Sequence, residues 1–185
     1  VVGLPPDAGH ADIPPVVLAP LSLADVEVTV AILPDPDAAN EGSAEAAATL
    51  IRRSTGARLT DDQTEADLVI ALASIEPPAL RACRSGTAVA PEAGAKVFLA
   101  CERLQEWAPG RPEPDEPVTR MWLSGPGVAR GRGVDILGVP EETVVELARL
   151  NAGGPRGIDT WLVDRSRRVC GIPRSSTIDV IARVA

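Results

Sequence analysis

The sequence has very few of the side chains on which most enzyme mechanisms depend. Its 185 residues include one histidine, His10, which lies in a Pro- and Gly-rich N-terminal stretch that we expect to be poorly ordered. A Ser-His-Asp triad, a Cys-His pair, a histidine-rich metal site or a histidine general base would all depend on that single residue. The composition therefore argues against these chemistries and predicts no metal centre.

Aromatic residues and positive charge are also scarce. Aromatics make up 2% of the chain, tyrosine is absent, and the formal net charge is -8. Nucleic-acid affinity is carried largely by excess Lys and Arg, and single-strand binding uses stacking aromatics. We therefore expect no nucleic-acid partner. The apolar residues come in short runs, none near the roughly 20 residues of a membrane helix, so we expect no membrane association either.

The cysteines do not form a recognisable framework. Cys83, Cys101 and Cys170 are odd in number and widely spaced, and no C-x-x-C occurs. We interpret them as structural or incidental thiols. Residues 1–12 lack the basic and apolar regions of a secretory signal, so we expect a cytoplasmic protein.

Lys96 is the only lysine and hence the only group that could form a Schiff base. It opens an apolar run, where a lone lysine is usually the solvated charge of an edge strand. We favour this edge-strand interpretation and predict no cofactor.

Hydrophobic periodicity predicts alternating strands and helices. Strands are expected over 26–33, 68–73, 96–102, 121–124 and 159–163, with the last one beginning near 169–170. Helices are expected over 41–54 and 141–151. A further helix is expected over 15–24, where Pro20 would kink or shorten it. The acid- and proline-rich residues 109–117 predict a surface loop. The pattern indicates one domain over residues 1–185, an α/β fold whose mixed, largely parallel central sheet is flanked by helices.

Glycine- and proline-rich segments follow several of these elements, at 85–95, 123–128, 154–159 and 171–177. Glycines that permit positive φ beside arginine and hydroxyl groups can form an anion-binding concavity. The same residues also make ordinary turns, and neither a Walker-type nor a dinucleotide-binding fingerprint accompanies them. From spacing alone we favour turns. Arg130, Arg132, Arg156 and Arg174 are candidates for phosphate or partner contacts. For Arg130 and Arg132 we favour solvated turn positions.

Five blocks in these segments resemble the PhnH family, accessory subunits of bacterial carbon-phosphorus lyase systems. In order they are Leu23-Ala24-Asp25, Ser85-Gly86-Thr87 through Pro91–Ala95, Gly125-Pro126-Gly127-Val128, Gly157-Ile158-Asp159 and Ile172–Ser176. The resemblance spans almost the whole chain. It departs where relatives have a further N-terminal helix, which we expect to be missing here, and where they have Phe-His but this chain has Arg52-Arg53.

The resemblance implies a reduced pyridoxal-phosphate-dependent transferase fold without the cofactor. It also implies membership of the lyase core complex, which forms α-D-ribose 1-methylphosphonate 5-triphosphate from ATP and phosphonate. We expect an accessory, non-catalytic subunit that partners other core subunits and is a homodimer when isolated. No catalytic residue is assigned, and activity of the subunit alone is left open. The alternatives are a nucleotide- or phosphate-binding subunit that contributes directly to the transfer, and a self-associating scaffold outside the complex. The candidate ligand or interface residues are Glu92, Gly125, Gly127, Asp159, Arg174, Ser175 and Ser176.

Overall fold

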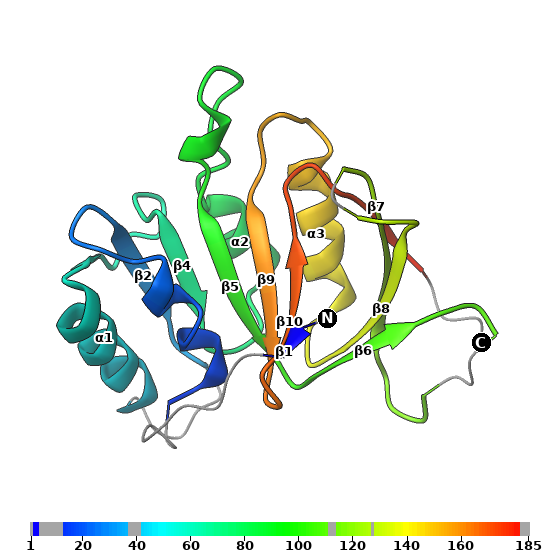
Figure 1. The fold of residues 1–185 in the computed structure, drawn as a ribbon, viewed down its shortest axis with the longest axis horizontal. Coiled ribbons are helices and arrows are strands. Elements are labelled where there is room, and N and C mark those ends of the chain that lie inside the picture. Colours follow the sequence, from blue (N-terminus) through cyan, green and yellow to red (C-terminus); the bar gives the residue numbers. More distant parts are fainter. Residues whose placement is uncertain (1, 4–12, 37–41, 111–113, 127, 182–185) are drawn as a thin grey trace.

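The computed structural model describes residues 2–3, 13–36, 42–110, 114–126 and 128–181. These residues form two β-sheets that lie side by side, with helices packed against both (Figure 1). One residue, Glu102, separates Lys96–Cys101, a central strand of the first sheet, from Arg103–Trp107, a strand of the second sheet. The two sheets are therefore joined by an almost continuous stretch of extended chain.

The larger sheet is mixed and mostly parallel. Its spatial order is β1 (Val2–Gly3), β10 (Arg168–Ile172), β9 (Asp159–Asp164), β5 (Lys96–Cys101), β4 (Leu68–Ala71), β2 (Thr29–Leu33) and β3 (Arg58–Leu59). The five strands from β9 to β3 run parallel, and β10 and β1 are antiparallel additions at one edge. This confirms the predicted mixed, largely parallel central sheet.

The second sheet was not predicted. It is wholly antiparallel, in the order β11 (Thr177–Val180), β7 (Thr119–Ser124), β8 (Arg132–Leu137) and β6 (Arg103–Trp107). Apolar and charged residues follow one another in β8, where the apolar Val134 precedes the charged Asp135. Such strands alternate core-facing and outward-facing side chains.

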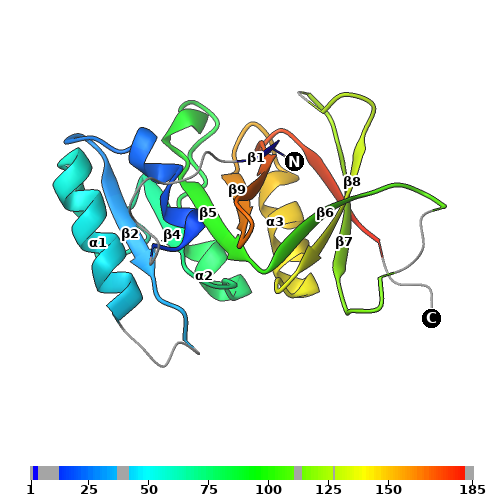
Figure 2. The ribbon, with the colours of Figure 1, turned by 60° about the horizontal axis from the view of Figure 1, so that its bottom comes forward.

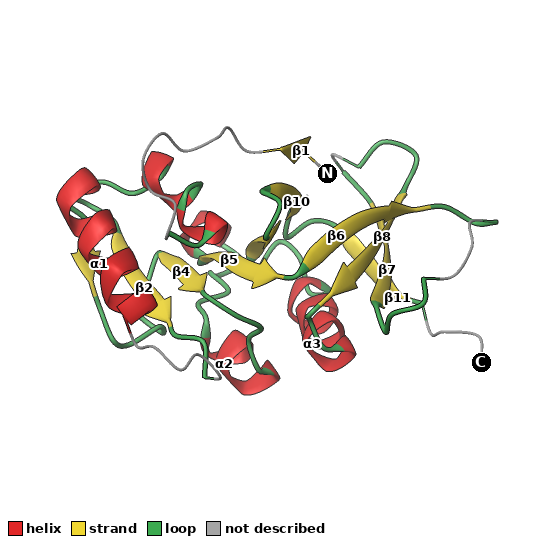
Figure 3. Cartoon of the chain, turned by 90° about the horizontal axis from the view of Figure 1, so that it is seen from below, coloured by secondary structure: helices red, strands yellow, loops and turns green. Residues whose placement is uncertain are grey.

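Helices cover both faces of the large sheet. The helical elements are α1 (Gly42–Thr55), α2 (Pro77–Ala82), α3 (Glu141–Asn151) and the 3₁₀ helices η1 (Pro15–Val17), η2 (Pro20–Ser22) and η3 (Pro91–Ala93). Figure 3 shows α2 and α3 on one side of the sheet and the η1–η2 segment on the other. α3 also contacts β7 and β11, so it lies between the two sheets (Figure 2). None of the described helices is long and apolar enough to cross a bilayer.

Two hydrophobic cores result from this layering. In β4, Val69 and Ala71 belong to the core that includes α2, α3 and the second sheet, whereas Leu68 and Ile70 belong to the core under α1 and η1. A strand buried on both faces needs apolar residues at every position, which explains its uninterrupted apolar run. On the η1 side, Phe98 stacks on Trp161 with ring centroids 4.9 Å apart.

The other element predictions have clear outcomes. Both long helices and the strands over 26–33, 68–73, 96–102, 121–124 and 159–163 are confirmed within a few residues. The helix expected over 15–24 is wrong: the segment forms η1 and η2 instead, because Pro15 and Pro20 each begin a new turn and lack the N–H that a longer helix needs. The strand near 169–170 exists as β10, but it is not the last, since β11 follows.

A buried ion pair lies on the face of the second sheet that points away from the main core. Arg120 donates from Nε to Asp135 Oδ1 at 2.6 Å and from Nη2 to Oδ2 at 3.1 Å, and the two side chains are 5% and 9% exposed. The Arg120 guanidinium also lies 4.4 Å from the ring centroid of Trp107. Trp122 meets Trp107 edge-on. This cluster shields the two charges from water.

Candidate functional site

A cavity of about 410 Å³ lies at the carboxyl edge of the large sheet. Four parallel strands end there, and the segment after each strand supplies one polar lining residue. These residues are Asp35 after β2, Ser74 after β4, Glu102 after β5 and Arg165 after β9. Open α/β sheets bind their ligands outside the carboxyl ends of their strands. The cavity is thus where the topology places a small-molecule site.

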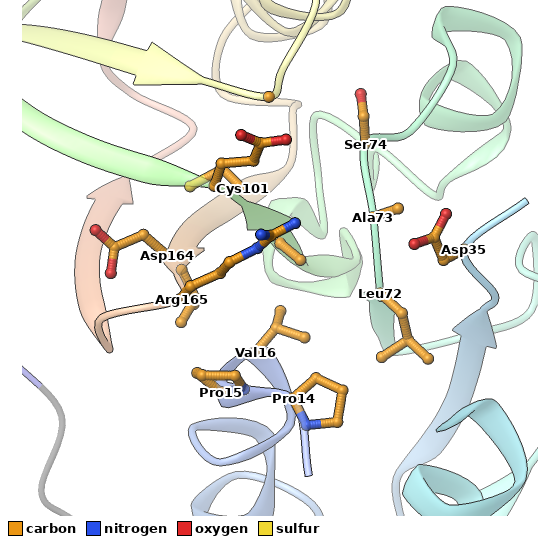
Figure 4. Close-up of a pocket in the computed structure, with 14 residues that line it drawn as sticks. Pro14, Pro15, Val16, Asp35, Leu72, Ala73, Ser74, Cys101, Asp164 and Arg165 are labelled. Carbon is orange, nitrogen blue, oxygen red and sulfur yellow. The ribbon is translucent and has the colours of Figure 1, made fainter. Parts of the chain in front are cut away.

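One wall of the cavity is apolar. η1 approaches from one side with Pro14, Pro15 and Val16, while Leu72 and Val163 line it from the strand ends. Figure 4 shows Pro14, Pro15 and Val16 together below the polar groups. η1 packs on β4, β5 and β9, which fixes this wall against the sheet. An apolar wall with a few polar groups is the usual composition of a small-molecule pocket.

Two reactive-looking groups at the cavity have structural roles. Asp164 is 1% exposed and accepts hydrogen bonds from the backbone N–H of Leu104 at 3.0 Å and of Arg168 at 2.8 Å. Figure 4 shows its carboxylate pointing away from Arg165. The thiol of Cys101 is buried, and burial together with nearby Asp164 raises its pKa to about 12. A thiol with that pKa is protonated at neutral pH and does not act as a nucleophile.

The other two cysteines are also buried and unpaired, as the sequence predicted for structural thiols. Burial raises the pKa of Cys83 to about 11 and that of Cys170 to about 11. Neither residue lines the cavity. The three thiols therefore serve as small apolar core groups.

The glycine-rich motif segments meet at the opposite, amino edge of the sheet. Arg174, which follows β10, forms an ion pair with Asp159, the first residue of β9. The Arg174 Nη2–Asp159 Oδ2 distance is 2.5 Å, Nε lies 3.3 and 3.2 Å from the two carboxylate oxygens, and the Arg174 backbone N–H donates to Oδ1 at 2.8 Å. The side chains are 16% and 22% exposed. This pair joins two of the predicted blocks.

Glycines allow the neighbouring loops to close on this pair. A Cβ on Gly94 would lie 2.6 Å from the carbonyl oxygen of Gly157 and 3.0 Å from Arg174 Nη1. Gly157 has φ +145°, and its N–H donates to the carbonyl of Ser85 at 2.8 Å. Asn151 at the end of α3 makes two hydrogen bonds with the backbone of Ile158. We call the residues Gly94, Asn151, Gly157, Asp159 and Arg174 the amino-edge frame.

The remaining candidate residues have different outcomes. Gly125, at φ +113°, faces the backbone of Ser175 and Ser176, so these three predicted residues do come together. The Oγ of Ser176 is buried without a hydrogen-bond partner among the described residues. Glu92 is exposed on η3 and makes no hydrogen bond or ion pair within the described part of the chain. Gly127 lies outside the described residues, as does His10.

The edge-strand interpretation of Lys96 is wrong. Lys96 opens β5, which is an interior strand, because β9, β10 and β1 continue the sheet beyond it. It is half-buried and pairs in register with Asp159. Its charge contributes to lowering the pKa of that carboxyl, so Lys96 belongs beside the amino-edge frame.

The four polar residues of the cavity were not singled out from the sequence. No motif contains them, and they come from segments as far apart as Asp35 and Arg165. A signal does exist, because each follows directly or closely on an apolar strand. Carboxyl ends of parallel strands share one edge, so the first polar residue after each such strand is a candidate.

The ion pair of the amino-edge frame makes stability depend on pH. Burial acts to raise the pKa of Asp159, but hydrogen bonds from the side chain and backbone of Arg174, with the charges of Arg174 and Lys96, outweigh it and hold the pKa below 3.8. A carboxyl whose pKa is lowered by folding stabilises the fold above its unfolded pKa and loses that contribution as pH falls through the folded value.

We therefore expect Asp159→Asn to lower the free energy of unfolding at neutral pH, and the gap between variant and wild type to narrow as the pH falls below 3.8. Urea denaturation at a series of pH values measures this gap. Asp61→Asn, at an exposed position, is the matched control. A gap that stays constant down to the acid transition would contradict the prediction.

The whole chain was also compared with known proteins. The family model described as "Bacterial phosphonate metabolism protein (PhnH)" matches residues 7–179. The matched range includes both the carboxyl-edge cavity and the amino-edge frame. A comparison with curated proteins finds no match.

Proposed function

The chain belongs to the PhnH family of bacterial phosphonate metabolism proteins, and from that membership we propose that it is an accessory, non-catalytic subunit of the carbon-phosphorus lyase core complex. In this role it supports formation of α-D-ribose 1-methylphosphonate 5-triphosphate from ATP and phosphonate by holding other core subunits in place. We propose that it acts in the cytoplasm as one domain. We also propose that its large sheet is that of a reduced pyridoxal-phosphate-dependent transferase used without the cofactor.

One observation carries the proposal: the motif residues are occupied by contacts within the chain. Arg174 is paired with Asp159, Gly94 and Gly157 accommodate close backbone contacts, and Asn151 holds Ile158. These segments carry the resemblance to the family, yet they lie at the sheet edge opposite the cavity. A framework that lies away from the small-molecule site fits a docking role better than a catalytic one.

The electrostatics favour this role over direct triphosphate binding. The guanidinium of Arg174 is neutralised by a partner carboxylate. In the cavity, Arg165 is accompanied by Asp35, Glu102 and Asp164. A triphosphate needs several converging cations or backbone N–H groups. We therefore rank the nucleotide-binding alternative second.

Co-expression of the tagged chain with the other lyase core subunits tests the proposal. We expect the subunits to be retained together and to elute as one species in size-exclusion chromatography, whereas the chain expressed alone should elute as a homodimer. Elution of the chain alone from the co-expression mixture would contradict the accessory role and would favour a scaffold outside the complex.

Two measurements on the isolated protein separate the alternatives. Turnover of a phosphonate by the chain alone would show that it is an enzyme in its own right. Saturable ATP binding that Arg174→Ala abolishes would favour the nucleotide-binding alternative, with Arg53→Ala as a control at an exposed position on α1.

A further inference from the structure

The carboxyl-edge cavity has a guanidinium on one side and a carboxylate on the far side, and a second carboxylate follows the strand next to the guanidinium. Figure 4 shows the Arg165 guanidinium extending into the cavity from the end of β9, and the Asp35 carboxylate pointing toward it from the far side. Glu102, after β5, also lines the cavity. The site thus presents a cationic group and an anionic group across a gap, and so resembles neither a purely anionic nor a purely cationic pocket.

Two of these groups have no partner in the described part of the chain. Arg165 and Glu102 are exposed, and their side chains take part in no hydrogen bond or ion pair there. Asp164, in contrast, is satisfied by backbone N–H groups. The side chains of Arg165 and Glu102 are therefore available to a ligand, and the Asp35 carboxylate adds negative charge on the far side of the cavity.

Size and composition narrow the class of ligand further. The volume of about 410 Å³ suits a small molecule. No aromatic side chain from the described residues lines the cavity, so these residues offer no stacking surface for a nucleobase or a sugar ring. The carboxylates of Glu102 and Asp35 beside the single guanidinium of Arg165 repel a ligand with several negative charges. A ligand with a single acidic group for Arg165 and an ammonium group for Glu102 and Asp35 satisfies all these features.

We propose that the cavity binds an aminoalkylphosphonate, a short zwitterion whose phosphonate group contacts Arg165 and whose ammonium group contacts Glu102 and Asp35. The alkyl chain between them lies against Pro15 and Val16 of η1. A guanidinium binds such an oxyanion through paired charge-assisted hydrogen bonds. The zwitterionic class follows from the cavity itself, and the choice of phosphonate as the acidic group rests on the proposed function.

Isothermal titration calorimetry with ligands of one carbon skeleton tests the proposal. The probes are 2-aminoethylphosphonate, ethylphosphonate, which lacks the ammonium group, and ethylamine, which lacks the phosphonate group. We expect saturable binding of 2-aminoethylphosphonate and at least tenfold weaker binding of the other two, since each loses one charge-assisted contact. Ethylphosphonate or ethylamine binding as tightly as the zwitterion would overturn the proposal, as would no binding of 2-aminoethylphosphonate at millimolar concentration.

β-Alanine, a zwitterion of similar length with a carboxylate, tests the acidic group. We expect it to bind more weakly than 2-aminoethylphosphonate, because phosphonate offers Arg165 an additional acceptor oxygen. Equal affinity would overturn the phosphonate assignment.

Variants connect the binding to the named groups. Arg165→Gln and Glu102→Gln should each weaken 2-aminoethylphosphonate about tenfold to a hundredfold, whereas Arg53→Gln should leave its affinity unchanged. Arg165 and Glu102 are exposed, so both variants should fold, and circular dichroism verifies this. Wild-type affinity in Arg165→Gln would overturn the proposal. The co-expression test is independent of this one. If the chain assembles with the lyase core subunits but does not bind 2-aminoethylphosphonate, only the binding site is rejected. If it binds 2-aminoethylphosphonate but does not assemble with them, only the accessory role is rejected.

Discussion

Arg120→Ala should lower the free energy of unfolding by about 3–5 kcal/mol, because it leaves the Asp135 carboxylate buried without its partner. The two side chains are 5% and 9% exposed and are joined by two hydrogen bonds. Loss of the guanidinium also removes its contact with the Trp107 ring. Guanidinium chloride denaturation followed by tryptophan fluorescence measures the change.

Two controls identify the cause of the Arg120 effect. The double variant Arg120→Leu/Asp135→Leu should recover most of the loss, since it leaves no unpaired buried charge. Arg103→Ala should cost about 1 kcal/mol or less, because its ion pair with Glu116 is exposed, at 42% and 52%. A loss in Arg120→Ala no greater than that in Arg103→Ala would mean that the outer face of the second sheet is open to water.

The large sheet was well predicted because a strand buried on both faces is a continuous apolar run in the sequence. Strands such as Leu68–Ala71 and Lys96–Cys101 are almost uninterrupted apolar runs. The strands β6 and β8 were missed because each has a polar outer face, and Asp135 stands in the middle of β8. Propensity disfavours a charged residue there, and the pairing with Arg120 that compensates for it depends on tertiary structure.

The two residues of the amino-edge ion pair were singled out from the sequence, but their pairing was not predicted. Asp159 and Arg174 were both singled out, yet they lie 15 positions apart, and nothing local indicates that they bind each other. The β9–β10 hairpin brings them together. Because Ile172 lies opposite Thr160, the residues just after β10 lie beside the start of β9. The cavity escaped prediction for a related reason, since its residues come together only once the spatial order of the strands is known.

Gly157→Ala should disrupt the amino-edge frame as a whole. The residue has φ +145°, a region that is essentially restricted to glycine and costs other residues about 1–3 kcal/mol. A Cβ there would also lie 2.5 Å from Asn151 Oδ1, which accepts a hydrogen bond from the N–H of Ile158. We therefore expect a loss of stability above the backbone cost alone, measured by urea denaturation.

The same variant tests whether this frame forms the docking surface. Retention with the other lyase core subunits should fall in Gly157→Ala even below its melting temperature, because Asp159 and Arg174 are displaced together with the loop. Gly153→Ala is the matched control: it lies in the same loop, and its added Cβ would meet nothing closer than Arg156 Nη2 at 3.9 Å. If both variants are retained like wild type while Gly157→Ala is measurably less stable, the frame only supports the fold, and the docking surface must lie elsewhere on the chain.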